Sequence, residues 1–215
     1  MSRKIPETIT EEELHTILKA ANKKSHKIAY LLAFYQGLRI SEIVGLKKQI
    51  SLCCKAEVWK IKEKDKNMVY KCSQCQREIT IDQMRRHLTD YQIPKLTMEN
   101  IDLKENLMMI KGAKGEKDRN IPIAPEIRKF LNQSSLPIKC GPRSLEIAFK
   151  LIGKKILNKD VHFHCLRHSG LTHYHNAKKW PIRFVQQFAG HADISTTMIY
   201  THVNPQDLQK IMNGG

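Results

Sequence analysis

The chain has 215 residues, of which 37 are Lys or Arg and 21 are Asp or Glu, so its formal charge is +16. A hydrophobic fraction of 41% supports a buried core and argues against a wholly disordered chain. Residues 28–35 are too few to cross a bilayer, and no signal-peptide pattern opens the chain, so secreted and membrane proteins are excluded. The charge favours a polyanionic partner, either nucleic acid or an anionic surface, over a protein that its lysines merely keep soluble.

Helix signals open the chain. Thr10 followed by Glu13 is a capping-box pattern, which predicts a helix over residues 11–21. Residues 28–35 are apolar on most sides and predict a buried helix that ends at Gly37. Ser41 is placed to cap a short helix over residues 42–46.

Residues 50–96 differ in composition from the rest of the chain. They are rich in Lys and Cys, with ten basic against six acidic residues, and predict an inserted module. The pair Cys72 and Cys75 offers two thiolates from one tight turn, as a structural zinc site needs. We expect zinc to be held by four of five residues: Cys53, Cys54, Cys72, Cys75 and His87.

The same stretch has zinc-finger character. Ile79 and Ile81 precede a predicted helix that carries Met84, His87 and Leu88. The alternative to zinc is a set of reduced structural thiols. Cys140 and Cys165 stand apart and are interpreted as small buried residues.

The second half of the chain predicts a hairpin followed by helices. The apolar runs 107–110 and 121–123 flank a tip rich in Gly and charge, which is typical of two strands and a turn. Helical patterns follow, with Pro in the first turn or Gly past the end in several of them. The predicted helices cover residues 125–133, 142–157, 164–177, 181–189, 195–202 and 204–212.

Polar residues with phosphate chemistry lie in these otherwise apolar helical surroundings. His164 and Arg167 are three positions apart, which puts them on one helix face. Arg and Lys are not usual metal ligands, whereas paired guanidinium groups match phosphate oxygens and stabilise a pentacovalent transition state. A tyrosine hydroxyl can act as the nucleophile. The set comprises Arg39, Lys114, His164, Arg167, His191 and Tyr200.

Four segments resemble the signatures of tyrosine recombinases of the Xer and phage-integrase type, and they occur in that family's order. They are GLRISEIVGL, IKGAKGEKDRNIPI, HCLRHSGLTHYH and FAGHADISTTMIYTHV. The resemblance implies an α+β, mainly α, catalytic domain with a small antiparallel sheet. It assigns residues 1–49 and 97–215 to that domain and leaves residues 50–96 as a small inserted zinc-binding module.

The resemblance also implies roles for single residues. Arg39 and Arg167 would clamp the scissile phosphate, and Tyr200 would attack it to give a 3′-phosphotyrosyl link and a free 5′-hydroxyl. Lys114 would be the general acid, with Lys111 and Lys117 as competitors for that role. His164 and His191 would orient the phosphate, and His164 is preferred as the acceptor of the tyrosine proton. Glu42 would support the site, and no catalytic cofactor is expected.

The implied partner is double-stranded DNA at recombination or integration sites. DNA contacts are expected from Lys111, Lys117, Arg119, Arg85 and Arg86. The resemblance further implies a homo-oligomer, a tetramer on DNA, with helix 204–212 either docking on a neighbouring subunit or packing on its own. It implies a cytoplasmic, nucleoid-associated protein without membrane contact.

Three questions stay open at this point. The resemblance leads us to expect no N-terminal core-binding domain, which the family usually carries. The chain would then be a minimal recombinase, a catalytic domain alone, or one whose inserted module replaces part of the missing clamp. One alternative function is a nicking-closing topoisomerase that uses the same phosphotyrosyl chemistry. Another is a DNA-binding regulator that keeps the fold without catalysis.

Overall fold

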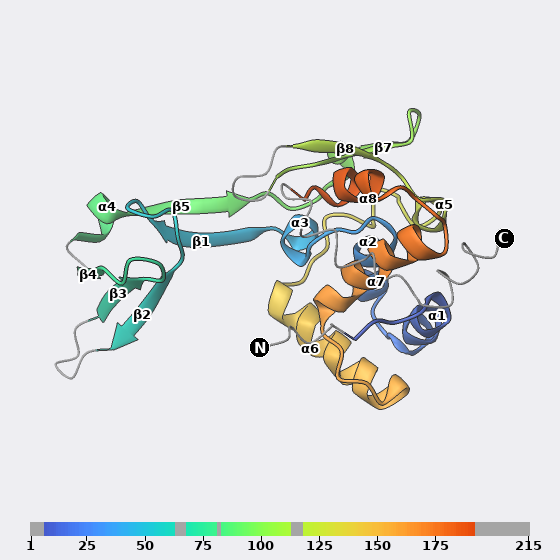
Figure 1. The fold of residues 1–215 in the computed structure, drawn as a ribbon, viewed down its shortest axis with the longest axis horizontal. Coiled ribbons are helices and arrows are strands. Elements are labelled where there is room, and N and C mark those ends of the chain that lie inside the picture. The colour runs from blue at the N-terminus through green and yellow to red at the C-terminus, as the bar shows by residue number, and fades with distance from the viewer. Residues whose placement is uncertain (1–6, 63–67, 81–82, 113–117, 192–215) are drawn as a thin grey trace, which may run out of the picture. The chain divides into compact units, whose positions relative to one another are not determined.

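The computed structural model describes residues 7–62, 68–80, 83–112 and 118–191 (Figure 1). Its contacts divide the chain into two compact units. The larger unit consists of Met1–Val44 and Lys95–Gly215, and the smaller unit is Gly45–Pro94. Composition had placed the boundaries of the insertion at residues 50 and 96. The smaller unit begins earlier because residues before 50 already form a strand that pairs within it.

The larger unit is mainly helical, with one small antiparallel sheet in the order β6-β7-β8. Its helices are α1 (Glu11–Ala20), α2 (Lys24–Tyr35), α3 (Ile40–Val44), α5 (Pro125–Arg128), α6 (Pro142–Ile152), α7 (Phe163–Asn176) and α8 (Ile182–Ala189). Its strands are β6 (Ile101–Asp102), β7 (Leu107–Ile110) and β8 (Arg119–Pro122). A short 3₁₀ helix (Met98–Asn100) precedes β6, and a π-helical turn (Gly153–Leu157) continues α6.

Most of the predicted elements of this unit form close to their expected bounds. Both hydrogen bonds of the capping box between Thr10 and Glu13 are present, so the predicted start of α1 is confirmed. The helix predicted over 125–133 is wrong in length, because α5 ends at Arg128. Side chains of Asn132 and Ser135 hydrogen-bond to nearby backbone groups there, which competes with helix continuation. The helices predicted over 195–202 and 204–212 lie outside the described residues.

The core of the larger unit forms where α2 packs on α7. Every residue of α2 from Ile28 to Tyr35 is buried, as its apolar sequence predicts. On α7, Gly170 allows the two backbones to approach closely. A Cβ atom at this position would lie 1.9 Å from the carbonyl oxygen of Phe34. This contact holds the loop after α2, and with it Arg39, against α7.

Replacing Gly170 with alanine is expected to destabilise the larger unit by about 3 kcal/mol, because a backbone oxygen cannot move aside as a side chain can. Gly141 provides the matched control, since a Cβ atom there meets nothing within 4 Å. Gly141→Ala should cost about 1 kcal/mol or less, which is the price of a poorer N-cap. Denaturant unfolding measures both variants, and equal losses would contradict the close approach of α2 and α7.

The smaller unit is built mainly from strands. It contains β1 (Leu46–Ser51), β2 (Val58–Lys62), β3 (Met68–Cys72), β4 (Glu78–Thr80), α4 (Met84–His87) and β5 (Leu88–Ile93). β1 and β5 form an antiparallel ribbon, and β2, β3 and β4 form a separate antiparallel sheet. The predicted helix carrying Met84, His87 and Leu88 is therefore reduced to one turn, because Leu88 already belongs to β5 and pairs with Ser51.

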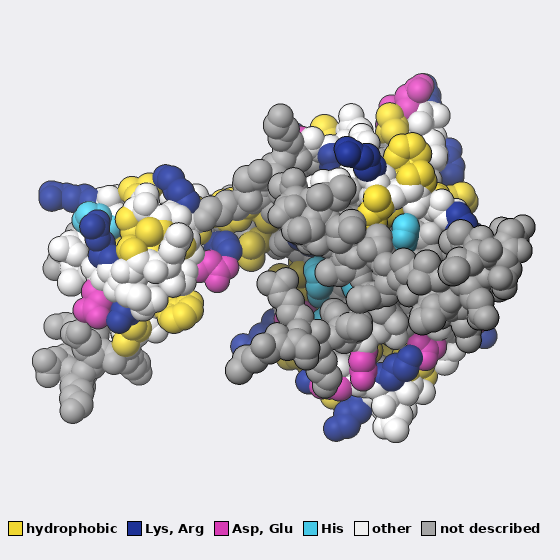
Figure 2. All heavy atoms as spheres, in the orientation of Figure 1, with side chains coloured by type: hydrophobic (Ala, Val, Ile, Leu, Met, Phe, Trp, Pro, Cys, Tyr) yellow, Lys and Arg dark blue, Asp and Glu magenta, His cyan; other side chains and the backbone are white. Residues whose placement is uncertain are grey.

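The surface of the larger unit keeps some apolar side chains. Figure 2 shows them gathered over β7, β8 and α8. Exposed apolar residues on these elements include Leu107, Met109 and Phe184. Within the described part of the chain, no helix is long and apolar enough to cross a membrane.

Candidate active site

Glu42 lies at the centre of a cluster of three arginines contributed by distant segments. It stands in α3, and its side chain is fully buried. Its Oε1 and Oε2 atoms accept from the guanidinium of Arg119 at 2.8 and 3.3 Å. Nη1 of Arg39 lies 3.4 Å from Oε1, and Nη1 of Arg167 lies 3.7 Å from Oε2. Glu42 also accepts from the backbone N–H of Arg39 at 2.7 Å, which fixes the start of α3.

Arg39 and Arg167 differ in exposure. The Arg39 side chain is 25% exposed, whereas that of Arg167 is 1% exposed. Arg167 donates to the carbonyl oxygens of Gly37 and Ala189, the latter at 2.8 Å. It therefore joins the loop after α2 to the end of α8, while Arg39 presents its guanidinium closer to the surface.

Burial alone would raise the pKa of Glu42. The hydrogen bonds and charge of Arg119, the charge of Arg167 and the backbone N–H of Arg39 outweigh burial, so the pKa lies below its usual value. Glu42 is therefore a carboxylate at neutral pH, and the three guanidinium groups leave this cluster with a net positive charge.

Arg119 was expected to contact DNA, and the structure places it differently. Its side chain is only 10% exposed. Besides Glu42, it binds the carbonyl oxygen of Phe188 through Nε at 3.3 Å. The donors of Arg119 are therefore engaged inside the protein, and its expected DNA contact stays a prediction.

The two histidines of the predicted set lie on α7 and directly after α8. His164 is exposed by its overall solvent accessibility, although neighbouring groups partly desolvate its ring, and His191 is half-buried. Burial of the ring and the positive charges of Arg167 and Arg39 lower the pKa of both residues, to about 4 for His164 and about 3 for His191. Both imidazoles are therefore neutral at pH 7, and a neutral imidazole can accept a proton.

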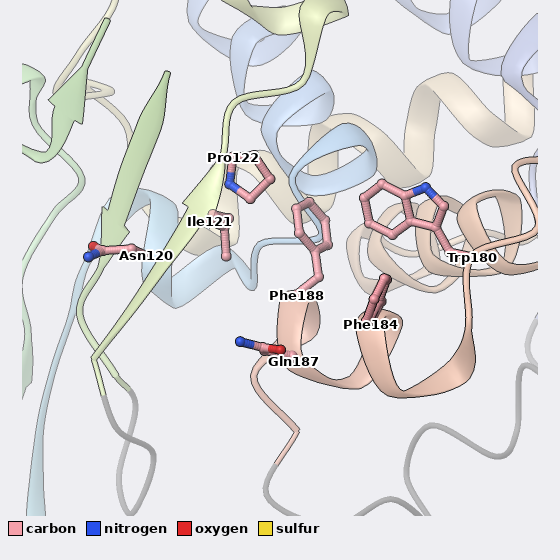
Figure 3. Close-up of a pocket in the computed structure, with 7 residues that line it drawn as sticks. All are labelled: Asn120, Ile121, Pro122, Trp180, Phe184, Gln187 and Phe188. Atoms are coloured by element: carbon pink, nitrogen blue, oxygen red, sulfur yellow. The ribbon is translucent and has the colours of Figure 1, made fainter. Parts of the chain in front are cut away.

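An aromatic cluster supports α8 beside the sheet. Phe188 lies between Ile121 of β8 and the rings of Trp180 and Phe184 (Figure 3). Trp180 stacks on Tyr174 with ring centroids 4.3 Å apart. Ile121, Trp180, Phe184 and Phe188 help to line a cavity of about 260 Å³, and no charged side chain lines it. It is thus unsuited to a phosphate, but its walls anchor the helix whose end carries Ala189 and His191.

The remaining predicted residues fall into two groups. Lys114, Lys117 and Tyr200 lie outside the described residues. Lys111 pairs with Asp118 at 2.7 Å at the base of the hairpin, and Arg85 and Arg86 are exposed on α4. Among the described residues, the structure thus brings together Arg39, Glu42, Arg167, His164 and His191, and it adds Arg119.

The four clustered cysteines of the smaller unit come together, and His87 is not among them. The Sγ atoms of Cys53, Cys54, Cys72 and Cys75 all lie within 4.8 Å of one another. Zinc–sulfur bonds of about 2.3 Å in a tetrahedron separate the sulfurs by about 3.8 Å, so this spacing fits a zinc ion. Hydrogen bonds from the Ser51 hydroxyl and from nearby backbone N–H groups lower the pKa of Cys72 to about 6, which favours the thiolate.

Two tight turns bring these cysteines together. In the first turn, the N–H of Ser51 donates to the carbonyl oxygen of Ala56, and Lys55 adopts a positive φ of 52°. In the second, the N–H of Cys72 donates to Arg77, and Gln76 has a φ of 59°. The first turn contributes the thiols of Cys53 and Cys54, and the second contributes those of Cys72 and Cys75.

Sequence reasoning missed the place of Arg119 and its neighbour Gly190. Gly190 has φ +71°, and a Cβ atom there would lie 2.8 Å from Cζ of Arg119. In the sequence, Gly190 indicates only the end of the helix predicted over 181–189. The signal that could have been used is the arginine that closes the resembled segment IKGAKGEKDRNIPI.

Parts of the chain are similar in sequence to known proteins. Residues 139–207 match the model of the phage integrase family. The tyrosine recombinase XerC of Pseudomonas fluorescens (strain Pf0-1) is 32% identical over 134 residues, which are 54% of this chain and 44% of that protein. The chain thus spans less than half the length of this curated relative.

Solved structures show the same fold. The crystal structure of XerA recombinase superposes with a TM-score of 0.60 at 22% identity and covers 99% of this chain and 66% of that one. The XerH site-specific recombinase bound to its palindromic difH substrate in a post-cleavage complex has a TM-score of 0.56 at 18% identity. It covers 98% of this chain and 53% of that one.

Proposed function

Because the chain belongs to the tyrosine recombinase family, we propose that it is a site-specific DNA recombinase that breaks and rejoins DNA strands. The observation that carries this proposal is the cluster of Arg39, Arg119 and Arg167 around the single buried carboxylate of Glu42. Its excess positive charge is suited to binding a phosphodiester. It would stabilise the transition state of phosphoryl transfer, which carries more negative charge than the phosphodiester itself.

The proposed reaction replaces one phosphate ester by another. The Tyr200 oxygen attacks the scissile phosphorus, its proton passes to His164, and the bond to the 5′-oxygen breaks. Lys114 gives a proton to that leaving oxygen, so the products are a 3′-phosphotyrosyl link and a 5′-hydroxyl. The neutral state of His164 supports its part as acceptor. A 5′-hydroxyl from another strand then reverses the attack.

The proposal extends to the partners. Double-stranded DNA is supported by the XerH relative of the same fold, which was solved on its substrate. Lys111 on the hairpin and Arg85 and Arg86 on α4 are proposed contacts to the phosphate backbone. A tetramer on DNA, in the cytoplasm at the nucleoid, follows from the family resemblance.

Covalent trapping tests the reaction. Nicked duplexes that lose their 5′-hydroxyl fragment after cleavage should form a covalent adduct, whose DNA identifies the site by sequencing and whose peptide contains Tyr200. The control variant Tyr200→Phe should give no adduct while keeping its DNA affinity, because the ring remains and only the hydroxyl is removed. An adduct formed by Tyr200→Phe, or mapped to another residue, contradicts the nucleophile. Site-independent relaxation of supercoiled plasmid would instead favour the topoisomerase.

We also propose that the smaller unit holds one structural zinc ion on its four cysteines. The donor set and its spacing support a tetrahedral site. The small apolar core of this unit also favours stabilisation by a bound metal ion. The buried apolar residues among its described positions number six: Ile50, Val69, Cys72, Ile79, Leu88 and Ile93. Units of about 50 residues with so small a core usually depend on a metal or on disulfides.

A further inference from the structure

Arg119 connects the two ends of the candidate active site. It opens β8, and three of its nitrogens are bound within the protein. Nη1 and Nη2 bind the two carboxylate oxygens of Glu42, and Nε binds the carbonyl oxygen of Phe188. One side chain from the sheet therefore contacts both α3 and the last turn of α8.

The contact with α8 is close as well as polar. A Cβ atom at Gly190 would lie 2.8 Å from Nη1 and 2.9 Å from Nε of Arg119. The guanidinium thus packs on the backbone of Gly190, one residue before His191. Any larger residue at position 190 would displace it.

The contact with Glu42 shapes the electrostatics of the cluster. Arg119 takes the shortest of the side-chain contacts that Glu42 makes, at 2.8 Å, while Arg39 and Arg167 stand at 3.4 and 3.7 Å. Without Arg119, the carboxylate would be left to these two arginines and would draw them closer. Glu42 would then neutralise positive charge of Arg39 and Arg167 that is otherwise available to bind an incoming phosphate.

We propose that Arg119 is a positioning residue for DNA cleavage, which holds Arg39 and Arg167 in place through Glu42 and His191 through the end of α8. The proposal rests on the proposed function. It assigns no DNA contact to Arg119, since its donors face the protein.

The test separates the rate of cleavage from DNA affinity. Arg119→Ala should form the covalent adduct about 100-fold more slowly at saturating nicked duplex, because small misplacements of catalytic groups have effects of this size. Its Kd for the same duplex should stay within about threefold, since no phosphate contact is removed. Arg128→Ala is the matched control: Arg128 also binds a backbone carbonyl, that of Leu103 at 2.7 Å, but its side-chain partners are Leu103 and Asn106 instead of Glu42. This control should cleave at the wild-type rate.

Two further variants exclude a merely structural effect. Arg119→Lys keeps the charge but cannot bind Glu42 and Phe188 together, so it should recover only part of the rate. Gly190→Ala should slow cleavage by displacing the guanidinium, and adding it to Arg119→Ala should cost less than it does alone. All rates are measured well below the unfolding temperature of each variant.

The outcomes are distinct. Wild-type cleavage by Arg119→Ala overturns the proposal, and so does a loss of affinity that accounts for the loss of rate, which would restore Arg119 as a DNA contact. Additive effects of the two substitutions would also overturn it. If the wild-type protein forms no adduct with any duplex, the proposed function fails instead, before the role of Arg119 is tested.

Discussion

Replacing Glu42 with glutamine is expected to slow covalent DNA cleavage by about 100-fold to 1,000-fold, a loss typical of removing a preorganised electrostatic group. Glutamine keeps the size of the side chain but removes the carboxylate that contacts the guanidinium groups of Arg39, Arg119 and Arg167. Breaking a buried ion pair on one side costs about 3–5 kcal/mol, so the larger unit should also lose stability. Trapping on a nicked duplex and denaturant unfolding measure the two effects.

The pH dependence of unfolding tests whether the negative charge of Glu42 causes the stability difference between wild type and Glu42→Gln. The folded-state pKa of Glu42 is lowered, so its stabilisation is fully present above the unfolded value near 4.5 and is lost as the pH falls through the folded value. The stability difference between wild type and Glu42→Gln should therefore shrink below about pH 4.5. Glu146→Gln, at an exposed position on α6, is the control and should change neither rate nor stability. A stability difference that stays constant down to low pH would show that the charge of Glu42 is not what matters.

Removing the proposed zinc ion is expected to unfold the smaller unit and leave the larger one folded. Structural zinc contributes about 10 kcal/mol or more of apparent binding free energy in small zinc-binding peptides, which exceeds what a core of six apolar residues supplies. The buried cluster of the larger unit, as far as the structure describes it, draws on no residue between 45 and 94. Hydrogen exchange after chelation should show lost protection in β1 to β5 and retained protection in α2 and α7.

Metal analysis and two cysteine variants sharpen this test. The purified protein should hold one zinc ion per chain, and Cys72→Ser should lower that content because Cys72 is the buried member of the cluster. Cys140→Ser, outside the cluster, should leave the zinc content unchanged. A metal-free wild-type protein with full protection in β2 and β3 would instead support a set of reduced thiols.

Local patterns explain the parts that were predicted well. The capping box of Thr10 and Glu13 and the apolar run of α2 act within a few residues of the chain, so their sequence is sufficient. The strands flanking the hairpin were recognised for the same reason, although β8 starts two residues earlier than its apolar run. The smaller unit shows the limit of such patterns, because short polar strands that pair across an insertion carry little periodicity of their own.

The sequence by itself indicated the family that the chain resembles, the order of the four resembling segments and the group of residues from which a phosphate site could be built. Tertiary structure alone decided which of these charged side chains form ion pairs with one another. Arg119 and Glu42 are 77 residues apart, so their contact is not visible in a local pattern. The sequence grouped the cysteines with His87, and only the fold shows that the four sulfurs come together without it. The physical reason is that a charged donor satisfies whichever acceptor the fold brings to it. Arg119, which reads as a surface arginine on a hairpin, is thus bound to a buried carboxylate, and His87 lies outside the cluster of four thiols.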